Sequence, residues 1–182
     1  MTVDAFKSFS KKQLILLNWW TDSSPYKNRD AIICDGSVRS GKTVCMFLSF
    51  IFWAFYMFSD SSFAVCGKTI TSLRRNIITP MLPMLRSLGF TYEELVSKNM
   101  IIIKKDGREN RFYIFGGKDE GSAALIQGMT LSGVMLDETA LMPRSFCEQA
   151  IARCSVDNSR LWFNCNPENP AHWFYTEWIK KA

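Results

Sequence analysis

Apolar and polar residues alternate along the chain in blocks that predict buried strands separated by helices. Four short apolar runs have the length and the residue types of buried strands. They cover residues 31–34, 63–67, 134–136 and 161–163. Helical spacing of apolar residues marks three further segments, residues 11–20, 70–88 and 144–153. Strands that alternate with helices in this way predict an α/β fold, with a mostly parallel sheet flanked by helices.

Two of the helical segments have an unusual composition. Residues 44–58 contain no charged side chain, and as a helix they would be about 22 Å long, against about 30 Å for the apolar core of a membrane. A membrane span is the alternative, and a helix buried on all sides in the α/β core is the interpretation we adopt. In residues 70–88, Pro80 and Pro83 are expected to interrupt or kink the helix, and Gly89 to end it.

A pair of β-rich segments lies in the middle of the chain. Residues 100–105 and 111–115 are rich in β-branched and aromatic side chains. Asp106 and Gly107 between them favour a tight turn. We therefore predict a β-hairpin insertion in the fold.

Composition narrows the class of protein. Hydrophobic residues make up 47% and charged residues 21% of the 182 residues, as in folded soluble domains, and we predict one domain over residues 1–182. The net charge of +5 permits an acidic partner such as a nucleic acid but does not require one. The N-terminal residues lack the apolar core of a signal peptide, so we expect a cytoplasmic protein.

The six cysteines form no Cys-x-x-Cys pair, and most lie in apolar runs, where a thiol behaves as a small hydrophobic side chain. We expect reduced thiols. Because His172 is the only histidine, we expect no structural zinc site.

The candidate chemistry begins with a glycine-containing turn between the first predicted strand and the uncharged helix. The turn reads Gly36, Ser37, Val38, Arg39, Ser40, Gly41, Lys42 and Thr43, which satisfies the phosphate-loop pattern G-x-x-x-x-G-K-[ST]. In such a loop the backbone N–H groups surround the phosphates of ATP, Lys42 contacts the β- and γ-phosphates, and the Thr43 hydroxyl is a ligand of Mg²⁺. A chance match in a chain of this length has a frequency of about 0.5%.

Two carboxylates, Asp137 and Glu138, follow the apolar run 134–136 directly. This arrangement is typical of a Walker B motif, in which the first carboxylate holds Mg²⁺ and the second polarises the attacking water. We assign these roles to Asp137 and Glu138, respectively. A solvated acidic turn at the end of a strand is the alternative.

Four further residues are candidates for the same site. Arg39 could stabilise charge on the γ-phosphate, or it could be an exposed loop arginine. Gln13 could bind the adenine edge through its amide, or it could be solvated. Asn164 and Asn166 follow another predicted strand, so either could sense the γ-phosphate, or both could cap the turn that the prolines behind them enforce.

Two groups of residues could contact nucleic acid. Lysines and arginines cluster at Arg74 and Arg75 and again at Lys104, Lys105, Arg108 and Arg111. They could bind a phosphate backbone, although solvated faces are the commoner explanation. The aromatic residues at 172–178 could stack on bases, but their helical spacing favours core packing or a docking surface.

Taken together, these motifs resemble the ATPase motor domain of the large terminase subunit of tailed bacteriophages, in the PBSX-like branch of defective prophages. The resemblance covers nearly the whole chain. It rests on residues 10–13 before the first helix, the phosphate loop with its internal Arg39, Ile-Gln-Gly-Met-Thr at 126–130 ahead of Val-Met-Leu-Asp-Glu at 134–138, and Phe-Asn-Cys-Asn-Pro-Glu-Asn-Pro at 163–170 followed by His-Trp-Phe.

The resemblance implies a P-loop NTPase fold of the additional-strand, catalytic-glutamate (RecA-like) type. It also implies a homo-oligomeric ring at a phage portal that couples hydrolysis of Mg²⁺-bound ATP to translocation of double-stranded DNA into the procapsid, in the cytoplasm of the bacterial host, with the portal protein and the terminase small subunit as partners. The resemblance gives Gln13 the adenine-reading role, Arg39 the role of the arginine within the phosphate loop, Glu138 the role of catalytic glutamate, and Asn164 or Asn166 the coupling role.

The chain departs from the family pattern in two respects. Some terminases carry an arginine about ten residues before the Walker B aspartate, where it acts on the ATP of a neighbouring subunit. Here that region offers Gln127, so Arg144 or Arg153 would have to serve, or none. Family members also continue into a nuclease domain, whereas this chain stops at Ala182, so we expect an incomplete motor domain and no DNA cleavage.

Two alternative functions stay open. A helicase-like or other nucleic-acid translocase could have the same fold, because fold does not fix function. A truncated remnant could bind nucleotide without turnover.

Overall fold

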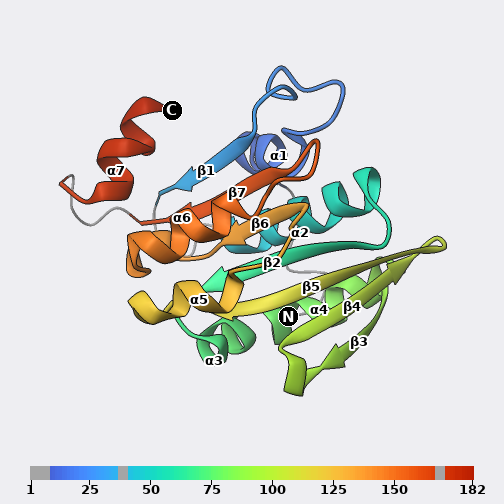
Figure 1. Cartoon of the computed structure of the whole chain (residues 1–182). Helices are drawn as coiled ribbons and strands as arrows, with labels where there is room; N and C mark the ends of the chain where they lie inside the picture. Colours follow the sequence, from blue (N-terminus) through green and yellow to red (C-terminus); the bar gives the residue numbers. More distant parts are fainter. Residues whose placement is uncertain (1–8, 37–40, 167–170) are drawn as a thin grey trace.

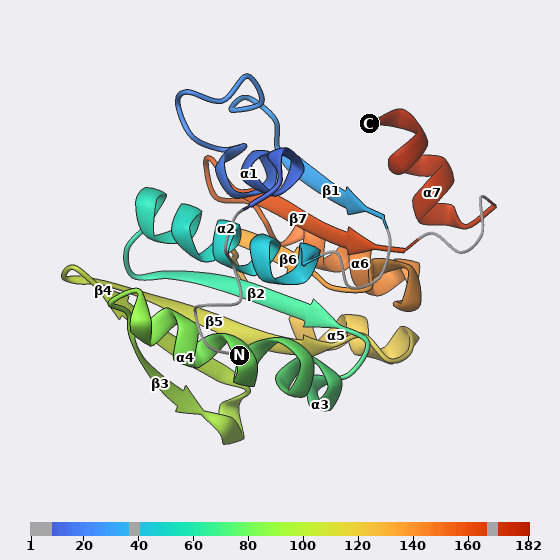
Figure 2. The same ribbon diagram turned by 180° about the vertical axis from the view of Figure 1, so that it is seen from behind.

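A seven-stranded sheet runs through the middle of the molecule, with helices on both faces (Figure 1 and, from behind, Figure 2). The computed structural model describes residues 9–36, 41–166 and 171–182. In chain order the strands are β1 (Ala31–Asp35), β2 (Ser61–Gly67), β3 (Thr91–Leu95), β4 (Met100–Lys105), β5 (Arg108–Gly116), β6 (Gly133–Leu136) and β7 (Arg160–Cys165). The α-helices are α1 (Lys11–Asn18), α2 (Lys42–Met57), α3 (Ile70–Leu73), α4 (Thr79–Ser87), α5 (Ala123–Ile126), α6 (Arg144–Ala152) and α7 (Trp173–Glu177).

The strand order is β1-β7-β6-β2-β5-β4-β3. The first five strands of this order are parallel, and β4 and β3 are antiparallel to their neighbours. Strand β7 therefore lies between β1, which leads into the phosphate loop, and β6, which leads into Asp137. The structure confirms the predicted mostly parallel sheet, and it contains the additional strand that the fold class requires.

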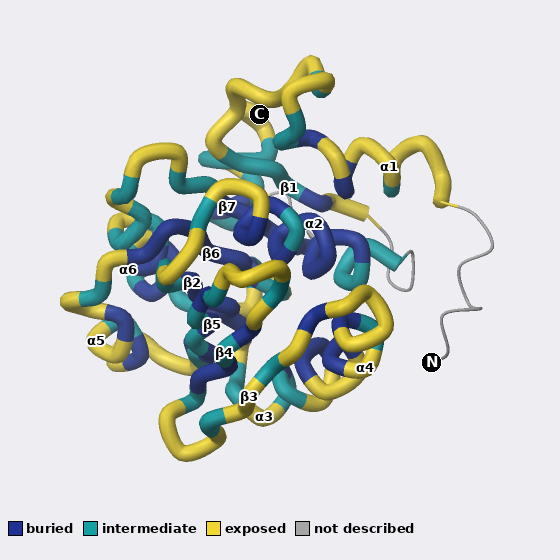
Figure 3. Tube along the Cα trace, turned by 90° about the vertical axis from the view of Figure 1, so that its right-hand side faces the viewer, coloured by how far each residue is buried: buried dark blue, intermediate teal, exposed yellow. Residues whose placement is uncertain are grey.

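Two apolar cores fill the layers on either side of the sheet. Helices α1, α2 and α4 pack on one face, and α5, α6 and α7 on the other (Figures 1 and 2). Figure 3 shows the buried trace running through the central strands and α2, while the outer sides of α1, α4 and α5 are exposed. The parallel strands are covered on both faces, which explains why they read as continuous apolar runs.

The uncharged segment forms α2, a helix of 16 residues with ten buried side chains. None of the helices among the described residues is long and apolar enough to cross a membrane. Within the core, the Trp53 ring lies 4.8 Å from the Trp162 ring, between their centroids. At Gly133 an added Cβ would lie 2.6 Å from Trp53 Cζ3, so the first residue of β6 leaves the space that this ring fills.

Buried Asn110 of β5 fixes the end of α2. Its Oδ1 accepts from the Ser61 backbone N–H at 3.0 Å, and its Nδ2 donates to the carbonyls of Ala54 and Phe58 at 3.3 and 3.2 Å. The last carbonyls of a helix lack partners within the helix, and this amide supplies one. The buried asparagine therefore joins α2 to the start of β2.

The predicted hairpin is present and forms part of the central sheet. Asp106 and Gly107 connect β4 to β5 with φ of 51° and 78°, the positive values that a two-residue type I′ turn requires. Strand β5 continues past the hairpin and pairs in parallel with β2. Strand β3, which pairs with β4 at the edge of the sheet, was not predicted.

The segment predicted as one interrupted helix forms three pieces, α3, the π-helical turn η2 (Arg74–Ile78) and α4. Pro80 lies in the first turn of α4, directly after the π-helical turn, and Pro83 lies inside that helix. Gly89 follows the end of α4 with φ of 84°, as the prediction for a helix stop requires.

Candidate active site

Three neighbouring parallel strands, β1, β7 and β6, have their carboxyl ends on the same side of the sheet, and the candidate residues lie at these ends or just after them. In the parallel register Cys34 pairs with Asn164, and Leu136 pairs with Phe163. Asn164 is therefore level with Asp137, the residue after Leu136. The order of the strands brings together side chains that are far apart in the sequence.

The phosphate-loop segment begins at Gly36 and ends in the first turn of α2. Gly36 has φ of 149° and Gly41, the N-cap of α2, has φ of 75°, values that favour glycine over residues with a Cβ. Four residues of the motif lie outside the described part of the chain: Ser37, Val38, Arg39 and Ser40. The described ends of the loop lead directly into the N-terminus of a long helix, where anions are stabilised.

The Lys42 ammonium lies between Gly36, at the start of the phosphate loop, and Asn166, just after β7. Its Nζ donates to the Gly36 carbonyl and to Asn166 Oδ1, the latter at 2.9 Å. Lys42 therefore connects the start of the phosphate loop to the end of β7. Asn166 itself is exposed.

Asn164 joins the other two candidates. Its Nδ2 donates to Thr43 Oγ1 at 3.2 Å and to Asp137 Oδ1 at 2.6 Å. The Asn164 side chain is buried, and its Oδ1 has no hydrogen-bond partner among the described residues. A buried acceptor without a partner is uncommon in proteins, and a water bound to a cation would be a suitable donor for it.

These residues fit a magnesium ion. Mg²⁺ is usually bound through one or two carboxylates, waters and substrate phosphate oxygens, and here the Thr43 hydroxyl and the Asp137 carboxylate meet at one amide nitrogen, Asn164 Nδ2. Among the described residues, no group of three or more His, Cys, Asp or Glu side chains has an arrangement that could hold a metal ion by itself. An ion held by Thr43 and Asp137 would thus rely on further oxygens from water and from a ligand.

Burial raises the pKa of the Asp137 carboxyl to about 6, and the hydrogen bond from Asn164 opposes this rise. The neighbouring Glu138 carboxylate raises the pKa of Asp137 further, whereas the Lys42 ammonium lowers it. A carboxylate that burial makes costly to charge is stabilised by a neighbouring cation. The electrostatics therefore favour cation binding at this position.

Glu138 is exposed and has a strained backbone, with φ of 53° and ψ of 48°. The other non-glycine residues with positive φ in the described chain are aspartates or asparagines, the types that tolerate this region best: Asp60, Asn99, Asp106 and Asn158. A glutamate here costs energy, which is a common feature of functional sites.

Thr139 is a residue of this site that the sequence reasoning missed. Its hydroxyl is fully buried and is placed to donate to the carbonyls of Leu136 and Asn164, at 3.2 and 3.1 Å. The side chain thus links the turn behind Glu138 to β7. Nothing in the sequence pattern distinguishes this threonine from a solvated turn residue.

Gln13 lies beside the phosphate loop. Its backbone N–H donates to Ser10 Oγ at 3.2 Å, and its Oε1 accepts from the Ser10 N–H at 2.8 Å, which forms a capping box at the start of α1. An added Cβ at Gly41 would lie 3.0 Å from Gln13 Nε2. The N-terminus of α1 is therefore in contact with the loop that precedes α2.

A cavity of about 450 Å³ opens between α1 and β1 and extends to Lys42. Its lining includes the apolar residues Ile15, Ile32 and Ile33 and also the polar residue Gln13. A cleft of this size whose lining combines apolar residues with polar groups is suited to a flat heterocycle. The cavity is continuous with the phosphate-loop end of the site.

Arg144 and Arg153, the two arginines considered for a role at the ATP of a neighbouring subunit, lie in different places from each other. Arg144, the first residue of α6, forms ion pairs with Glu148 at 2.6 Å and Glu177 at 2.7 Å. Arg153 follows the end of α6, and its carbonyl accepts from Leu131, just before the start of β6. Arg153 therefore lies near the amino end of β6, whereas Asp137 follows its carboxyl end.

Three basic residues of the hairpin have partners within the chain. Lys104 pairs with Glu109 at 2.8 Å, Arg111 pairs with Asp60 at 2.5 Å, and Arg108 donates to the last carbonyls of α2. A solvated, internally paired face explains this cluster without a phosphate backbone. The C-terminal aromatic residues pack as expected, because Phe174 of α7 lies 5.2 Å from Phe163 between ring centroids.

Residues 33–182 match the family model described as terminase large subunit, T4likevirus-type, N-terminal. The comparison with curated proteins gives no match. The narrower assignment to the PBSX-like branch stays a prediction.

Among solved structures, the chain is similar to the large terminase of a thermophilic bacteriophage, which has been solved in several crystal forms. One of these forms is 52% identical, with a TM-score of 0.92, over 96% of this chain and 43% of the phage protein. The same terminase in complex with ADP is 51% identical, with a TM-score of 0.92, over 95% and 42% of the two chains. Its complex with ATP-gamma-S is 50% identical, with a TM-score of 0.90, over 96% and 42%. The present chain thus spans less than half the length of the terminase structures described here.

Proposed function

The chain belongs to the family of T4-like-virus-type large terminase subunits, matching their N-terminal part, and from this premise we propose that it hydrolyses Mg²⁺-bound ATP to drive double-stranded DNA into a phage procapsid. The observation that carries the proposal is that the candidate side chains meet at the carboxyl ends of β1, β7 and β6. There Asn164 bonds both Thr43 and Asp137, while Lys42 bonds the end of β7.

The terminase of the thermophilic bacteriophage, about half identical to this chain, binds ADP and ATP-gamma-S, which supports a nucleotide in this site. We place the triphosphate against the amides that begin at Gly36, with the Lys42 ammonium on the β- and γ-phosphate oxygens. The adenine would occupy the cavity between α1 and β1, beside the Gln13 amide.

Thr43 and Asp137 would hold Mg²⁺, with Asn164 orienting both side chains. When bound, the ion would neutralise charge on the phosphate oxygens. Glu138 would accept a hydrogen bond from the attacking water and take its proton as the bond to the γ-phosphorus forms and the bond from that phosphorus to the β,γ-bridging oxygen breaks, which releases ADP and phosphate. Arg39 keeps its predicted role of stabilising charge on the transferred phosphoryl group.

The remaining parts of the proposal come from the family. They are a ring of identical subunits at the portal, a terminase small subunit as partner, and a location at the procapsid in the host cytoplasm. DNA cleavage is not part of the proposal. Double-stranded DNA is the proposed polymer substrate because the family is that of terminases.

The test measures phosphate release from the full chain with and without double-stranded DNA, alongside equilibrium ATP binding. We expect turnover in the wild type, weakened ATP binding in Lys42→Ala, and retained binding without turnover in Glu138→Gln. Glu93→Gln, an exposed glutamate on β3 at the far edge of the sheet, is the matched control and should behave as the wild type.

Three outcomes would contradict the proposal. Equal turnover in the wild type, Lys42→Ala and Glu138→Gln would show that this site is not the ATPase. A wild type that binds ATP but releases no phosphate in either condition would favour the remnant without turnover. Strand unwinding by the wild type would favour the helicase-like alternative.

A further inference from the structure

The carboxyl ends of β6, β2 and β5 lie side by side, and this row of strand ends continues the candidate active site away from the phosphate loop. The Asp137 backbone N–H donates to the Cys66 carbonyl of β2 at 2.8 Å. The Gly117 N–H, just after β5, donates to the Gly67 carbonyl at 2.8 Å. Figure 1 shows α3 and α5 at this end of β2 and β5. The residues that follow β2 and β5 are therefore close to the segment that carries Glu138.

Two exposed lysines lie at these strand ends. Lys68 follows β2 directly, and Lys118 comes two residues after the end of β5. Each is one residue beyond the hydrogen bond that joins the two segments. Among the residues that the structure describes, neither lysine forms an ion pair or a side-chain hydrogen bond. Two cations on adjoining segments repel each other, so the stability of the fold does not explain them.

The helical segment behind Lys68 adds a third exposed cation. Thr71 and Arg75 are both exposed and are four residues apart, which is the spacing of one helix face, whereas Leu73 is buried. Arg75 lies in η2, and π-helical turns of this kind occur frequently at functional sites. Its Nε donates to Asn76 Oδ1 at 3.1 Å, and no carboxylate in the described part of the chain pairs with it.

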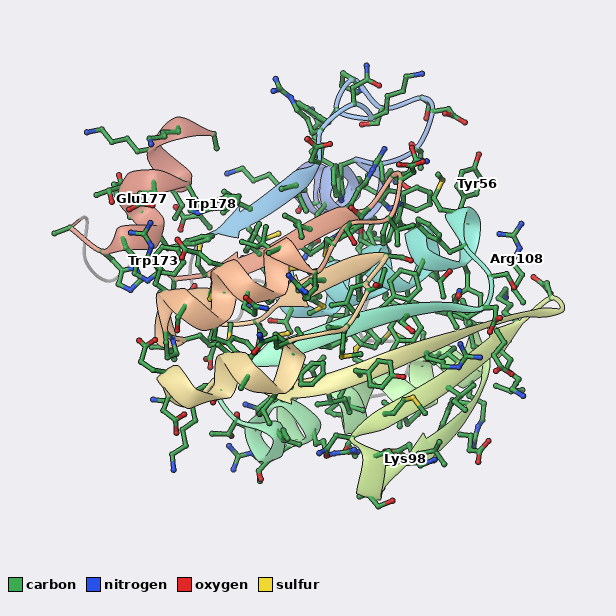
Figure 4. The ribbon with its side chains drawn as sticks, in the orientation of Figure 1. Tyr56, Lys98, Arg108, Trp173, Glu177 and Trp178 are labelled. Carbon is green, nitrogen blue, oxygen red and sulfur yellow. The ribbon has the colours of Figure 1, made fainter. Side chains whose placement is uncertain are left out.

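Two other arginines show how the chain satisfies a cation that serves the fold. Arg74, which precedes Arg75, has its Nη1 3.2 Å from Glu94 Oε2. Arg108 begins β5, at the other end of that strand from Lys118. It lies beside Tyr56 (Figure 4) and donates to the last carbonyls of α2.

The acids that follow Lys118 in the sequence are engaged elsewhere. Asp119 Oδ1 accepts from the Ser122 hydroxyl at 3.2 Å, and Glu120 Oε2 accepts from the Ser145 hydroxyl. Within the described residues, the fold therefore supplies no carboxylate that pairs with any of the three cations.

We propose that Lys68, Arg75 and Lys118 form a surface that binds the phosphate backbone of double-stranded DNA. Phosphates suit ammonium and guanidinium groups that have no carboxylate partner, and such contacts depend on charge and carry no base sequence information. The three side chains offer no aromatic ring for stacking on unpaired bases, which favours a duplex over a single strand. The inference rests on the proposed function, in which duplex DNA is the substrate, and it places the DNA beside the segment that carries Glu138.

The first test measures binding of a short duplex of random sequence to the full chain by fluorescence anisotropy, over about 50 to 200 mM salt. Each of Lys68→Ala, Arg75→Ala and Lys118→Ala should weaken binding about two- to fivefold. Each should also make the plot of log binding constant against log salt concentration shallower, by about 0.9 in slope, the value for one phosphate contact. Wild-type slopes in all three variants would overturn the inference.

Lys27→Ala and Arg29→Ala are the matched controls. Both residues are exposed and precede β1, so they lie at the amino ends of the parallel strands, away from the proposed surface. Each control removes the same charge as its test variant and should keep the wild-type slope. If the controls lower the slope as much as Lys68→Ala and Arg75→Ala do, net charge explains the binding and the proposed surface is wrong.

A second test keeps or reverses the charge at the two strand ends. Because phosphate contacts depend on charge, Lys68→Arg combined with Lys118→Arg should bind the duplex as the wild type does. Lys68→Glu combined with Lys118→Glu should lose most of the binding. Melting temperatures confirm that both double variants are folded. Equal binding by the arginine and the glutamate variants would contradict the proposal.

Phosphate release, measured in parallel, separates this inference from the proposed function. If the wild type hydrolyses ATP and binds the duplex, but the three alanine variants bind as tightly as the wild type, only the inference fails. If the duplex binds through these residues but no phosphate is released, the proposed ATPase fails and the surface stands. A wild type that does not bind the duplex at about 50 mM salt rules out the surface, whatever its ATPase activity.

Discussion

Asn164 donates a hydrogen bond to the Asp137 carboxylate over 2.6 Å, from a strand that separates β6 from β1. The same Nδ2 lies 3.2 Å from Thr43 Oγ1. One buried amide thus fixes the distance between the end of the phosphate loop and the first acidic residue. This relationship depends on strand order, because Asn164 could not reach both side chains from any other strand of the sheet.

Replacing Asn164 by alanine should therefore raise the Mg²⁺ concentration needed for half-maximal ATPase activity. Loss of a residue that orients metal ligands typically costs about 10- to 100-fold in metal affinity. The measurement is ATPase rate against Mg²⁺ concentration, together with ATP binding in the absence of Mg²⁺, which should change little. Asn76→Ala, an exposed asparagine on η2, is the control. Equal Mg²⁺ requirements in all three proteins would show that the Asn164 contacts are not needed for the ion.

The raised pKa of Asp137 predicts how the stability of the chain depends on pH without Mg²⁺ and nucleotide. Burial raises this pKa to about 6 in the folded chain, against about 3.9 in the unfolded chain. The folded chain holds the proton more tightly, so the fold gains stability as the pH falls through 6, and the gain is complete below about pH 4. The total is about 3 kcal/mol for a shift of this size.

The comparison of wild type with Asp137→Asn isolates this contribution, because other titrating groups contribute equally to both proteins. Asp137→Asn should be the more stable protein at pH 8 in EDTA, and its advantage should disappear near pH 4. Free energies of unfolding from denaturant titrations measure the difference. A difference that is constant with pH, or that grows as the pH falls, would contradict the assignment.

Gly133→Ala should destabilise the chain by about 3 kcal/mol, because overfilling a packed core costs up to this amount. The new Cβ would lie 2.6 Å from Trp53 Cζ3 and 3.1 Å from the Arg160 carbonyl, and the Trp53 ring is fully buried. Gly121→Ala is the matched control, since its Cβ would meet nothing nearer than Asp119 Oδ1 at 3.4 Å. Thermal unfolding of the two variants should differ clearly, and similar melting temperatures would mean that the Trp53 environment is looser than described.

Much of the fold could be predicted from the sequence because the central elements are apolar on all sides. The runs that became β1, β2, β6, β7 and α2 are continuous and bounded by polar or turn residues, so local pattern alone locates them. Strand β3 was missed for the opposite reason. Its sequence, Thr-Tyr-Glu-Glu-Leu, is polar because the strand lies at an exposed edge, and its pairing with β4 determines its structure.

The candidate site, too, could be predicted from the sequence only in part. The glycines, Lys42 and the two carboxylates were identified because their chemistry requires fixed spacing in the sequence. The different places of Asn164 and Asn166 could not be predicted, because they depend on which strand lies between β1 and β6. Thr139 was missed because its burial results from tertiary packing. Similarly, the hairpin cations read as a possible nucleic-acid surface until their ion pairs were known.

The backbone of Glu138 provides the last prediction. This residue has φ of 53°, a region in which a Cβ costs about 1 kcal/mol and glycine does not pay that cost. Glu138→Gly should therefore be more stable than Glu138→Ala by about 1 kcal/mol, while both should lack ATPase activity. Free energies of unfolding at neutral pH measure the difference. At a helical position the order should reverse, so Ala152→Gly at the end of α6 should be less stable than the wild type. If Glu138→Ala equalled or exceeded Glu138→Gly in stability, the glutamate would not be held in a strained conformation.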